Sequence, residues 1–171
     1  LKEILEQNIN DMSILIVDDN SPDGTANIVR KYMEKNKKIH LMVRETERGR
    51  GAAEIAGFKK ALEMGADVVG EMDADFSHDP KDLPNLIEAC KKNEVAIGSR
   101  LIPGGKDIGR SPLRTVLTKF GTMYTDILLG TKVRDSNSGF RCYRREALEK
   151  INLNKVKSKL YELAQEMTYK A

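Results

Sequence analysis

The chain of 171 residues is 40% hydrophobic and 32% charged, an ordinary composition for one soluble globular domain with a sizeable core. A formal net charge of +3 and an aromatic content of 5% argue against a nucleic-acid-binding protein, because such proteins carry stronger basic patches and more rings for base stacking. No apolar run approaches the roughly 18 residues of a membrane-spanning helix, and no signal peptide opens the chain.

Short apolar runs alternate with longer segments of helical periodicity along the chain. We expect strands at 13–18, 39–44, 67–72 and 94–99, and helices at 24–36, 51–64, 80–92 and 113–129. This alternation favours an α/β fold with a mainly parallel sheet covered by helices. Helical patterns also stand at 1–5 and 160–167, and because neither end has the character of a natural terminus, we expect a fragment of a longer protein.

The two cysteines, Cys90 and Cys142, stand apart from each other and from any histidine pair. They therefore form neither a zinc-binding pattern nor a disulfide framework. A reducing, cytoplasmic environment fits this usage best.

Two carboxylates separated by one small residue, Asp73 and Asp75, follow the apolar run of the third expected strand. Residues two apart on a strand share a face, so both acids can reach one hard cation where the strand gives way to a loop. Magnesium binds readily to one or two carboxylates together with phosphate oxygens. A polar loop in which Asp75 or Ser77 caps a helix remains the alternative for this segment taken alone.

Three further polar segments follow expected strands. Asp18 and Asp19 precede a Ser-Pro-Asp-Gly-Thr turn and either serve that turn or accept hydrogen bonds from a nucleotide. Ser99 and Arg100 follow the fourth strand, where a basic residue suits a phosphate, although solvation alone explains any single arginine. Residues 135–141 (Asp-Ser-Asn-Ser-Gly-Phe-Arg) form a polar turn that either admits a ligand or lies on the surface.

Residues 49–53 (Gly-Arg-Gly-Ala-Ala) do not spell a phosphate-binding loop or a dinucleotide fingerprint, and we interpret them as a closely packed helix start. In open parallel sheets, ligands bind beyond the carboxyl ends of the strands. The segments at 18–19, 73–75 and 99–100 are therefore expected to converge on one crevice.

Taken in this order, residues 17–25, 72–78, 98–100 and 135–141 resemble the inverting nucleotide-sugar glycosyltransferases of the family that includes dolichyl-phosphate mannosyltransferase. The resemblance covers about 12–145 and, more loosely, the rest of the chain. It implies a Rossmann-like nucleotide-diphospho-sugar transferase fold of the A type, formed by a single catalytic domain over 1–171. The relatives' first strand and their late membrane-anchoring region have no counterpart here.

The resemblance also implies roles for individual residues. Nucleotide-sugar contacts fall on Asp18, which reads the base, and on Asp19, Asp73, Asp135 and Ser138. Asp73 and Asp75 hold Mg2+ or Mn2+ against the donor diphosphate, and Ser77 stands where relatives supply another ligand to the metal. Acceptor-phosphate contacts fall on three residues: Arg100, Arg114 and Thr118. The residues expected to serve catalysis are Asp75, Arg100, Arg114 and Glu166.

The expected chemistry is direct displacement at the anomeric carbon of the donor sugar. A sugar hydroxyl acceptor needs a general base, whereas a phosphate monoester, with a second pKa of about 6, is already largely ionised near neutrality. The chain contains no tryptophan, so the Gln-x-x-Arg-Trp motif of polysaccharide synthases is absent. We therefore expect transfer of a hexose, with mannose from GDP-mannose as the first choice, to a polyprenyl or dolichyl phosphate at the cytoplasmic face of a membrane.

Two alternatives remain open at this point. One is a glycosyltransferase that uses UDP-glucose or another nucleotide sugar and a soluble acceptor. The other is a phosphorylation-dependent receiver domain, because residues 14–20 (Ile-Leu-Ile-Val-Asp-Asp-Asn) also resemble the opening acidic strand of that fold. The 54 positions between Asp19 and Asp73 are longer than a receiver needs, and no Lys-Pro pair follows in the later loops.

Overall fold

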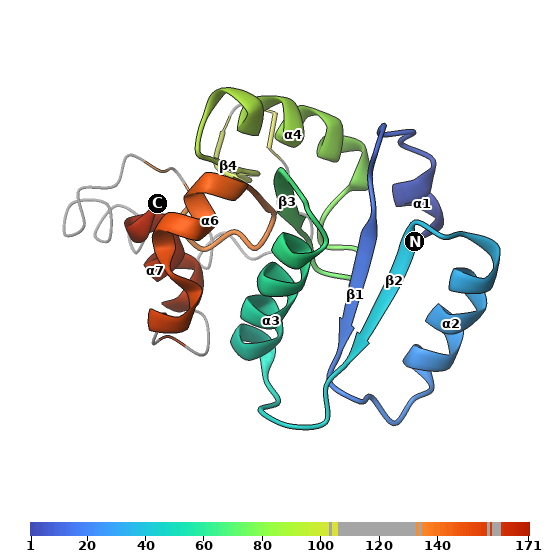
Figure 1. The fold of residues 1–171 in the computed structure, drawn as a ribbon. Helices are drawn as coiled ribbons and strands as arrows, with labels where there is room; N and C mark the ends of the chain where they lie inside the picture. The colour runs from blue at the N-terminus through green and yellow to red at the C-terminus, as the bar shows by residue number, and fades with distance from the viewer. Residues whose placement is uncertain (103, 106–132, 134, 157, 159–161) are drawn as a thin grey trace, which may run out of the picture.

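The computed structural model describes residues 1–171 apart from 103, 106–132, 134, 157 and 159–161 (Figure 1). Its elements in chain order are α1 (Lys2–Leu5), β1 (Ile14–Asp18), α2 (Thr25–Lys35), β2 (Ile39–Val43), α3 (Arg50–Glu63), β3 (Val68–Glu71), the 3-10 turn η1 (Pro80–Asp82), α4 (Leu83–Lys92), β4 (Val95–Ile97), β5 (Arg141–Arg144), α6 (Arg145–Ile151), η2 (Leu153–Lys155) and α7 (Glu162–Lys170). The four expected strands and the first three expected helices are confirmed, and the helix expected at 113–129 lies outside the described residues.

The described strands form two hydrogen-bonded sheets. β1 and β2 pair in parallel, with Ile14 opposite Ile39. In the second sheet, β5 lies between β3 and β4 and runs antiparallel to both. The α/β class is therefore confirmed. The antiparallel strand β5 was not predicted, because its sequence Arg-Cys-Tyr-Arg shows neither an apolar run nor an apolar-polar alternation.

Alternation along β5 directs its side chains into two cores on opposite faces of the sheet. Tyr143 packs with Phe58 of α3 and with apolar residues of α6 and α7, and its ring meets the Phe58 ring edge-on at 5.2 Å. Cys142 faces the other core, which α4 covers with Leu83, Leu86 and Cys90. Helix α3 packs against both β1 and β3 and so bridges the two sheets (Figure 1).

The helix starts follow from local chemistry. Thr25 opens α2 and donates its backbone N–H and its hydroxyl to Asp23, at 2.9 and 2.7 Å. Asp79 accepts the backbone N–H of Lys81, and Pro80 occupies the first position of η1, where its missing N–H costs nothing. Among the described residues, no helix is both long and apolar enough to cross a membrane.

Candidate active site

The carboxyl ends of β1, β3 and β4 and the start of β5 carry the polar residues that the sequence singled out. The antiparallel direction of β5 brings its first residue, Arg141, level with the last residues of β3 and β4, Glu71 and Ile97. The turn before β5 therefore reaches the same edge of the sheet as the loops after β3 and β4. This placement is what an open α/β sheet offers a ligand.

The loop after β3 holds the two expected metal ligands. Asp73 donates its backbone N–H to Nδ1 of His78 at 3.0 Å, and the His78 ring stacks on Phe140 with centroids 5.0 Å apart. Asp75 is exposed, and hydrogen bonds from the hydroxyl and the backbone N–H of Ser77 lower the pKa of its carboxyl. The carboxylates of Asp73 and Asp75 are therefore both accessible to solvent, and that of Asp75 is ionised near neutrality.

His78 is subject to the charges of both the acids and the arginines of the site. Burial lowers the pKa of its imidazole, and the positive charges of Arg100 and Arg50 lower it further, against the opposing effect of Asp73 and Asp75. Since Nδ1 accepts a hydrogen bond, the neutral ring carries its proton on Nε2. Sequence reasoning did not assign His78 to the site, although it stands in the segment 72–78 that carried the resemblance.

Arg50 was also missed, because residues 49–53 were interpreted as a helix start only. Its Nη2 lies 3.2 Å from Oδ1 and 3.4 Å from Oδ2 of Asp73. Gly139 comes close to both side chains: a Cβ placed there would lie 2.6 Å from Nη2 of Arg50 and 3.6 Å from Oδ2 of Asp73. The turn before β5 thus touches the acidic loop through a residue without a side chain.

Asp18 and Asp19, expected to contact the nucleotide, lie at the end of β1. Asp18 is buried and accepts the backbone N–H and the hydroxyl of Ser21, at 3.2 and 2.6 Å. Asp19 forms an ion pair with Arg44 at 2.8 Å and accepts the backbone N–H of Gly49 at 2.7 Å. The second contact places the loop after β1 against the residue that precedes Arg50.

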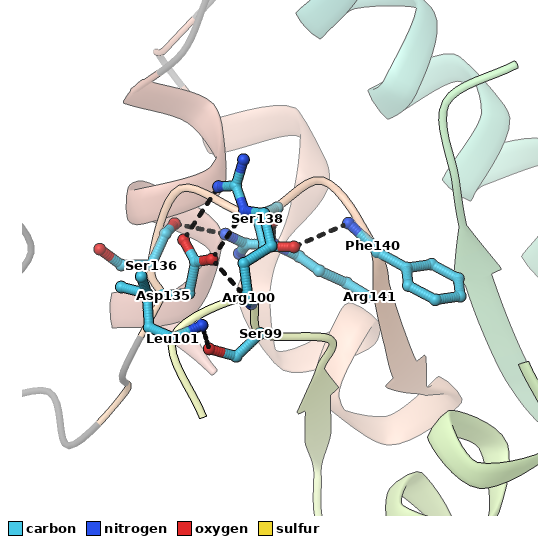
Figure 2. A network of polar contacts seen from close by, with 8 residues as sticks. All are labelled: Ser99, Arg100, Leu101, Asp135, Ser136, Ser138, Phe140 and Arg141. Carbon is cyan, nitrogen blue, oxygen red and sulfur yellow. Dashed lines mark hydrogen bonds and ion pairs between the residues drawn. The ribbon is translucent and has the colours of Figure 1, made fainter. Parts of the chain in front are cut away.

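Arg100 and Asp135 form a paired guanidinium and carboxylate, shown in Figure 2. Nε of Arg100 lies 3.2 Å from Oδ2 of Asp135, and Nη2 lies 3.3 Å from Oδ1. Asp135 is fully buried, whereas one third of the Arg100 side chain is exposed. Ser138 is also buried, and its hydroxyl accepts the backbone N–H of Phe140 at 3.3 Å.

Arg141, at the start of β5, is fully buried and donates to groups from two parts of the chain. Its guanidinium binds the backbone oxygens of Ser136 and Ser138 in the preceding turn (Figure 2). It also donates to the backbone oxygen of Ala164 at 2.6 Å and to the hydroxyl of Thr168 at 2.7 Å, both on α7. Arg141 therefore joins the polar turn to the last described helix.

Two glutamates lie below the acidic loop, near Arg141. Burial is the main reason that the pKa of Glu71 stands well above its usual range, and the neighbouring Glu54 raises it further. Burial also raises the pKa of Glu54. The charge of Arg141 opposes both shifts but does not outweigh burial, so the pKa values of both glutamates stay above their usual range.

The remaining expected residues divide into two groups. Glu166 lies on α7, where its carboxylate accepts the Ser158 backbone N–H at 2.8 Å and pairs with Lys170 at 2.6 Å. Arg114 and Thr118 lie outside the described residues. The structure thus brings together Asp73, Asp75 and Arg100 with the unpredicted Arg50 and His78, and it places Glu166 among the contacts of α7.

An α/β sheet edge that carries paired acids beside arginines is suited to a metal-bound, phosphate-containing ligand. Comparison with known proteins gives the family: the profile described as Glycosyl transferase family 2 matches residues 1–152. The chain belongs to this family, and the A-type fold implied by the resemblance is thereby confirmed. Membership also overturns the receiver alternative.

Three curated relatives match most of the chain. An undecaprenyl-phosphate mannosyltransferase of Micrococcus luteus is 39% identical over 97% of this chain and 68% of its own length. A polyprenol monophosphomannose synthase of Mycolicibacterium smegmatis is 42% identical over 92% of this chain and 60% of its own length. A dolichol-phosphate mannosyltransferase of Pyrococcus furiosus is 38% identical over 86% of this chain and 42% of its own length. The chain thus spans between about two fifths and two thirds of these relatives.

Proposed function

We propose that this chain forms one catalytic domain that transfers mannose from GDP-mannose to a polyprenyl phosphate, with inversion at the anomeric carbon and with Mg2+ or Mn2+. The observation that carries the proposal is that the acidic loop after β3 and the Arg100 loop after β4 lie at one edge of the sheet, where Arg50 contacts Asp73. Support comes from the names of the three relatives, each of which refers to mannose and to a lipid phosphate or polyprenol.

The donor set at the acidic loop fits a divalent cation that is completed by substrate. Among the described residues, no group of three or more His, Cys, Asp and Glu side chains is arranged to hold a metal. Two carboxylates suffice for Mg2+ when phosphate oxygens and waters supply the other ligands. Asp73 and Asp75 would hold the metal, with Ser77 beside them, and the metal would neutralise charge on the departing nucleoside diphosphate.

The chain's own residues would position the reactants rather than activate a hydroxyl. His78 cannot take a proton at Nδ1 while that atom accepts the Asp73 backbone N–H. An ionised phosphate acceptor needs no general base, and it needs cations for orientation. Arg100 is partly exposed beside the site and suits that task, with Asp135 holding its guanidinium in place. Arg114 and Thr118 remain proposed acceptor contacts on the strength of the resemblance alone.

A lipid phosphate acceptor places the reaction at a membrane surface. We therefore propose that the chain works at the cytoplasmic face of a membrane. The anchoring itself would come from the acceptor or from parts of the protein outside the described residues.

Transfer of radiolabel tests the proposal. The chain is incubated with GDP-[14C]mannose, a detergent-dispersed short polyprenyl phosphate and either Mg2+ or Mn2+, and the label is followed into the organic phase. We expect metal-dependent transfer that Asp75→Asn abolishes. The matched control is Asp79→Asn, which keeps a capping side chain on η1 and leaves transfer unchanged. Parallel incubations use UDP-[14C]glucose as the donor or a soluble sugar as the acceptor, and label that moves only in these would replace the proposal by its alternative.

A further inference from the structure

We infer that Arg50 pairs with the metal-binding carboxylate of Asp73 when no ligand is bound. When metal and donor bind, the Arg50 side chain moves, and its guanidinium binds the donor's diphosphate instead. The inference rests on the proposed function, because it takes a nucleoside diphosphate as the ligand. In the described structure the guanidinium contacts both carboxylate oxygens of Asp73 through Nη2. A divalent cation and Arg50 therefore compete for the same two oxygens.

The ion pair between Arg50 and Asp73 is weak enough to be broken by a ligand. Half of the Arg50 side chain and more than one third of the Asp73 side chain are exposed to solvent. Ion pairs of this kind contribute only about 0–1 kcal/mol, since water and salt compete with them. A metal that binds Asp73 and Asp75 together can displace Arg50 at small cost, because only a flexible, half-exposed side chain has to move.

Helix stability does not explain why an arginine stands at this position. Arg50 is the first residue of α3, and its first turn contains no acidic residue. A cation at that end of a helix is disfavoured, because the helix dipole places partial positive charge there. An arginine in this place is therefore better explained by what its side chain contacts beyond the helix.

The surroundings leave room for the exchange. Gly139 has no Cβ, and a Cβ would stand 2.6 Å from Nη2 of Arg50, so the space occupied by the guanidinium depends on glycine. The backbone N–H of Gly49 is fixed to Asp19 at 2.7 Å, which anchors the backbone just before Arg50. The side chain can swing while its attachment point stays in place beside the acidic loop.

Once displaced, Arg50 would carry an unpaired guanidinium within one side-chain length of the Asp73 carboxylate, which would hold the metal. A guanidinium binds phosphate oxygens through two parallel hydrogen bonds, and it keeps its charge at any physiological pH. Arg50 thus acts first as the counter-ion of Asp73 and then as the counter-ion of the diphosphate.

Isothermal titration calorimetry separates these two roles, because they predict changes of opposite sign. Arg50→Gln should bind Mn2+ alone about two- to fivefold more tightly than the unaltered chain. The reason is that the variant lacks the guanidinium that competes with the metal for Asp73 with the strength of an ordinary surface ion pair. The same variant should bind GDP in saturating Mn2+ about ten- to a hundredfold more weakly, as expected for the loss of a charged hydrogen bond. Arg50→Lys, which keeps the charge, should recover part of the GDP affinity.

Arg48→Gln is the matched control, because Arg48 is an exposed arginine two residues before Arg50, in the loop that leads into α3. It removes the same net charge and should change neither titration by more than about twofold. Circular dichroism melting verifies that each variant is folded. Weaker binding of both Mn2+ and GDP by a folded Arg50→Gln would show that Arg50 only supports the acidic loop, and it would overturn the inference.

The unaltered chain distinguishes this failure from that of the proposed function. GDP binding that depends on Mn2+ in the unaltered chain, together with unchanged titrations of Arg50→Gln, would overturn the role of Arg50 alone. Absence of metal-dependent GDP binding by the unaltered, folded chain would overturn the proposed function and the role of Arg50 together.

Discussion

Arg100 and Asp135 are separated by 35 positions in the chain, yet two nitrogens of the Arg100 guanidinium face the two carboxylate oxygens of Asp135 at 3.2 and 3.3 Å. The pair joins the loop after β4 to the turn before β5. Because Asp135 is fully buried and Arg100 is partly exposed, the carboxylate orients a cation that faces the site. Asp135 therefore orients Arg100, and its expected contact with the nucleotide sugar stays a prediction.

Asp135→Ala should destabilise the protein by about 2–3 kcal/mol, because it removes the buried carboxylate that pairs with the partly buried guanidinium of Arg100. Urea unfolding at neutral pH measures the change. Lys150→Ala is the control, since it breaks an exposed ion pair with Glu94 and should cost less than about 1 kcal/mol. Equal losses in the two variants would contradict a structural role for the Arg100–Asp135 pair.

Arg141→Met should destabilise the protein by about 3 kcal/mol or more, because the backbone oxygens of Ser136, Ser138 and Ala164 lose their buried donor. Hydrogen exchange should also become faster in α7, which Arg141 ties to the turn before β5. The control is Arg144→Met, which removes a half-exposed arginine of the same strand that pairs with Glu146 of α6. Unchanged exchange in α7 would show that the helix is held by its apolar contacts alone.

Two glycine substitutions should separate stability from ligand binding. In Gly98→Ala, the new Cβ would lie 2.8 Å from Cδ1 of Phe140, whose ring is stacked on His78, and the expected cost is about 1–3 kcal/mol. In Gly139→Ala, the new Cβ meets the far end of the Arg50 side chain, which can move, so stability should change by less than about 1 kcal/mol.

In a Mn2+ titration, Gly139→Ala should be the variant with the changed affinity, although it is the variant with the smaller change in stability. Gly139→Ala pushes Arg50 away from Asp73 and should tighten Mn2+ binding, as Arg50→Gln does. Gly98→Ala does not touch Arg50 and should not tighten Mn2+ binding. Thermal melting followed by calorimetry on the same samples provides both readings, and a loss of stability in Gly139→Ala that matches Gly98→Ala would count against a mobile Arg50.

The sequence predicted those parts of the fold that depend on local chemistry. Apolar runs located β1 to β4 within two residues, and the Asp79-Pro80 pair located the start of η1. It did not predict β5, whose first residue is an arginine that is buried because its acceptors come from residues up to 27 positions away. The alternation of apolar and polar residues cannot reveal such a strand, because arginine counts as a polar, surface-facing residue in that pattern even where it is buried.

The candidate site was predicted to a similar extent. The positions of Asp73, Asp75 and Arg100 beyond the carboxyl ends of β3 and β4 follow from a rule of α/β sheets and agree with the structure. The pairing of Arg50 with Asp73 spans 23 positions, and that of Asp19 with Arg44 spans 25. Each depends on how two loops meet in space, which no local pattern encodes. The sequence offers one indication that Arg50 belongs to the site, namely a basic residue at a helix start, where a cation is disfavoured.

The buried glutamates predict an unusual dependence of stability on pH in the metal-free protein. The pKa of Glu71 is raised in the folded state, so the folded state binds more protons than the unfolded state above the ordinary carboxyl pKa of 4.5. The contribution of Glu71 to stability is therefore fully present below that pH and is lost as pH rises through the folded pKa. Glu71→Gln removes this loss, because a neutral amide of the same shape does not ionise.

We accordingly expect Glu71→Gln to be more stable than the unaltered chain at pH 8 and to approach it at pH 4, as measured by urea unfolding at each pH. Glu88→Gln is a control of opposite sign, because Lys91 lowers the pKa of the exposed Glu88 carboxyl. That variant should be slightly less stable than the unaltered chain at pH 8 and equal to it at low pH. If Glu71→Gln were instead the less stable variant at pH 8, the ionised Glu71 carboxylate would be stabilised by Arg141 more strongly than burial opposes it, and the two glutamates would serve as the counter-charge of that buried guanidinium.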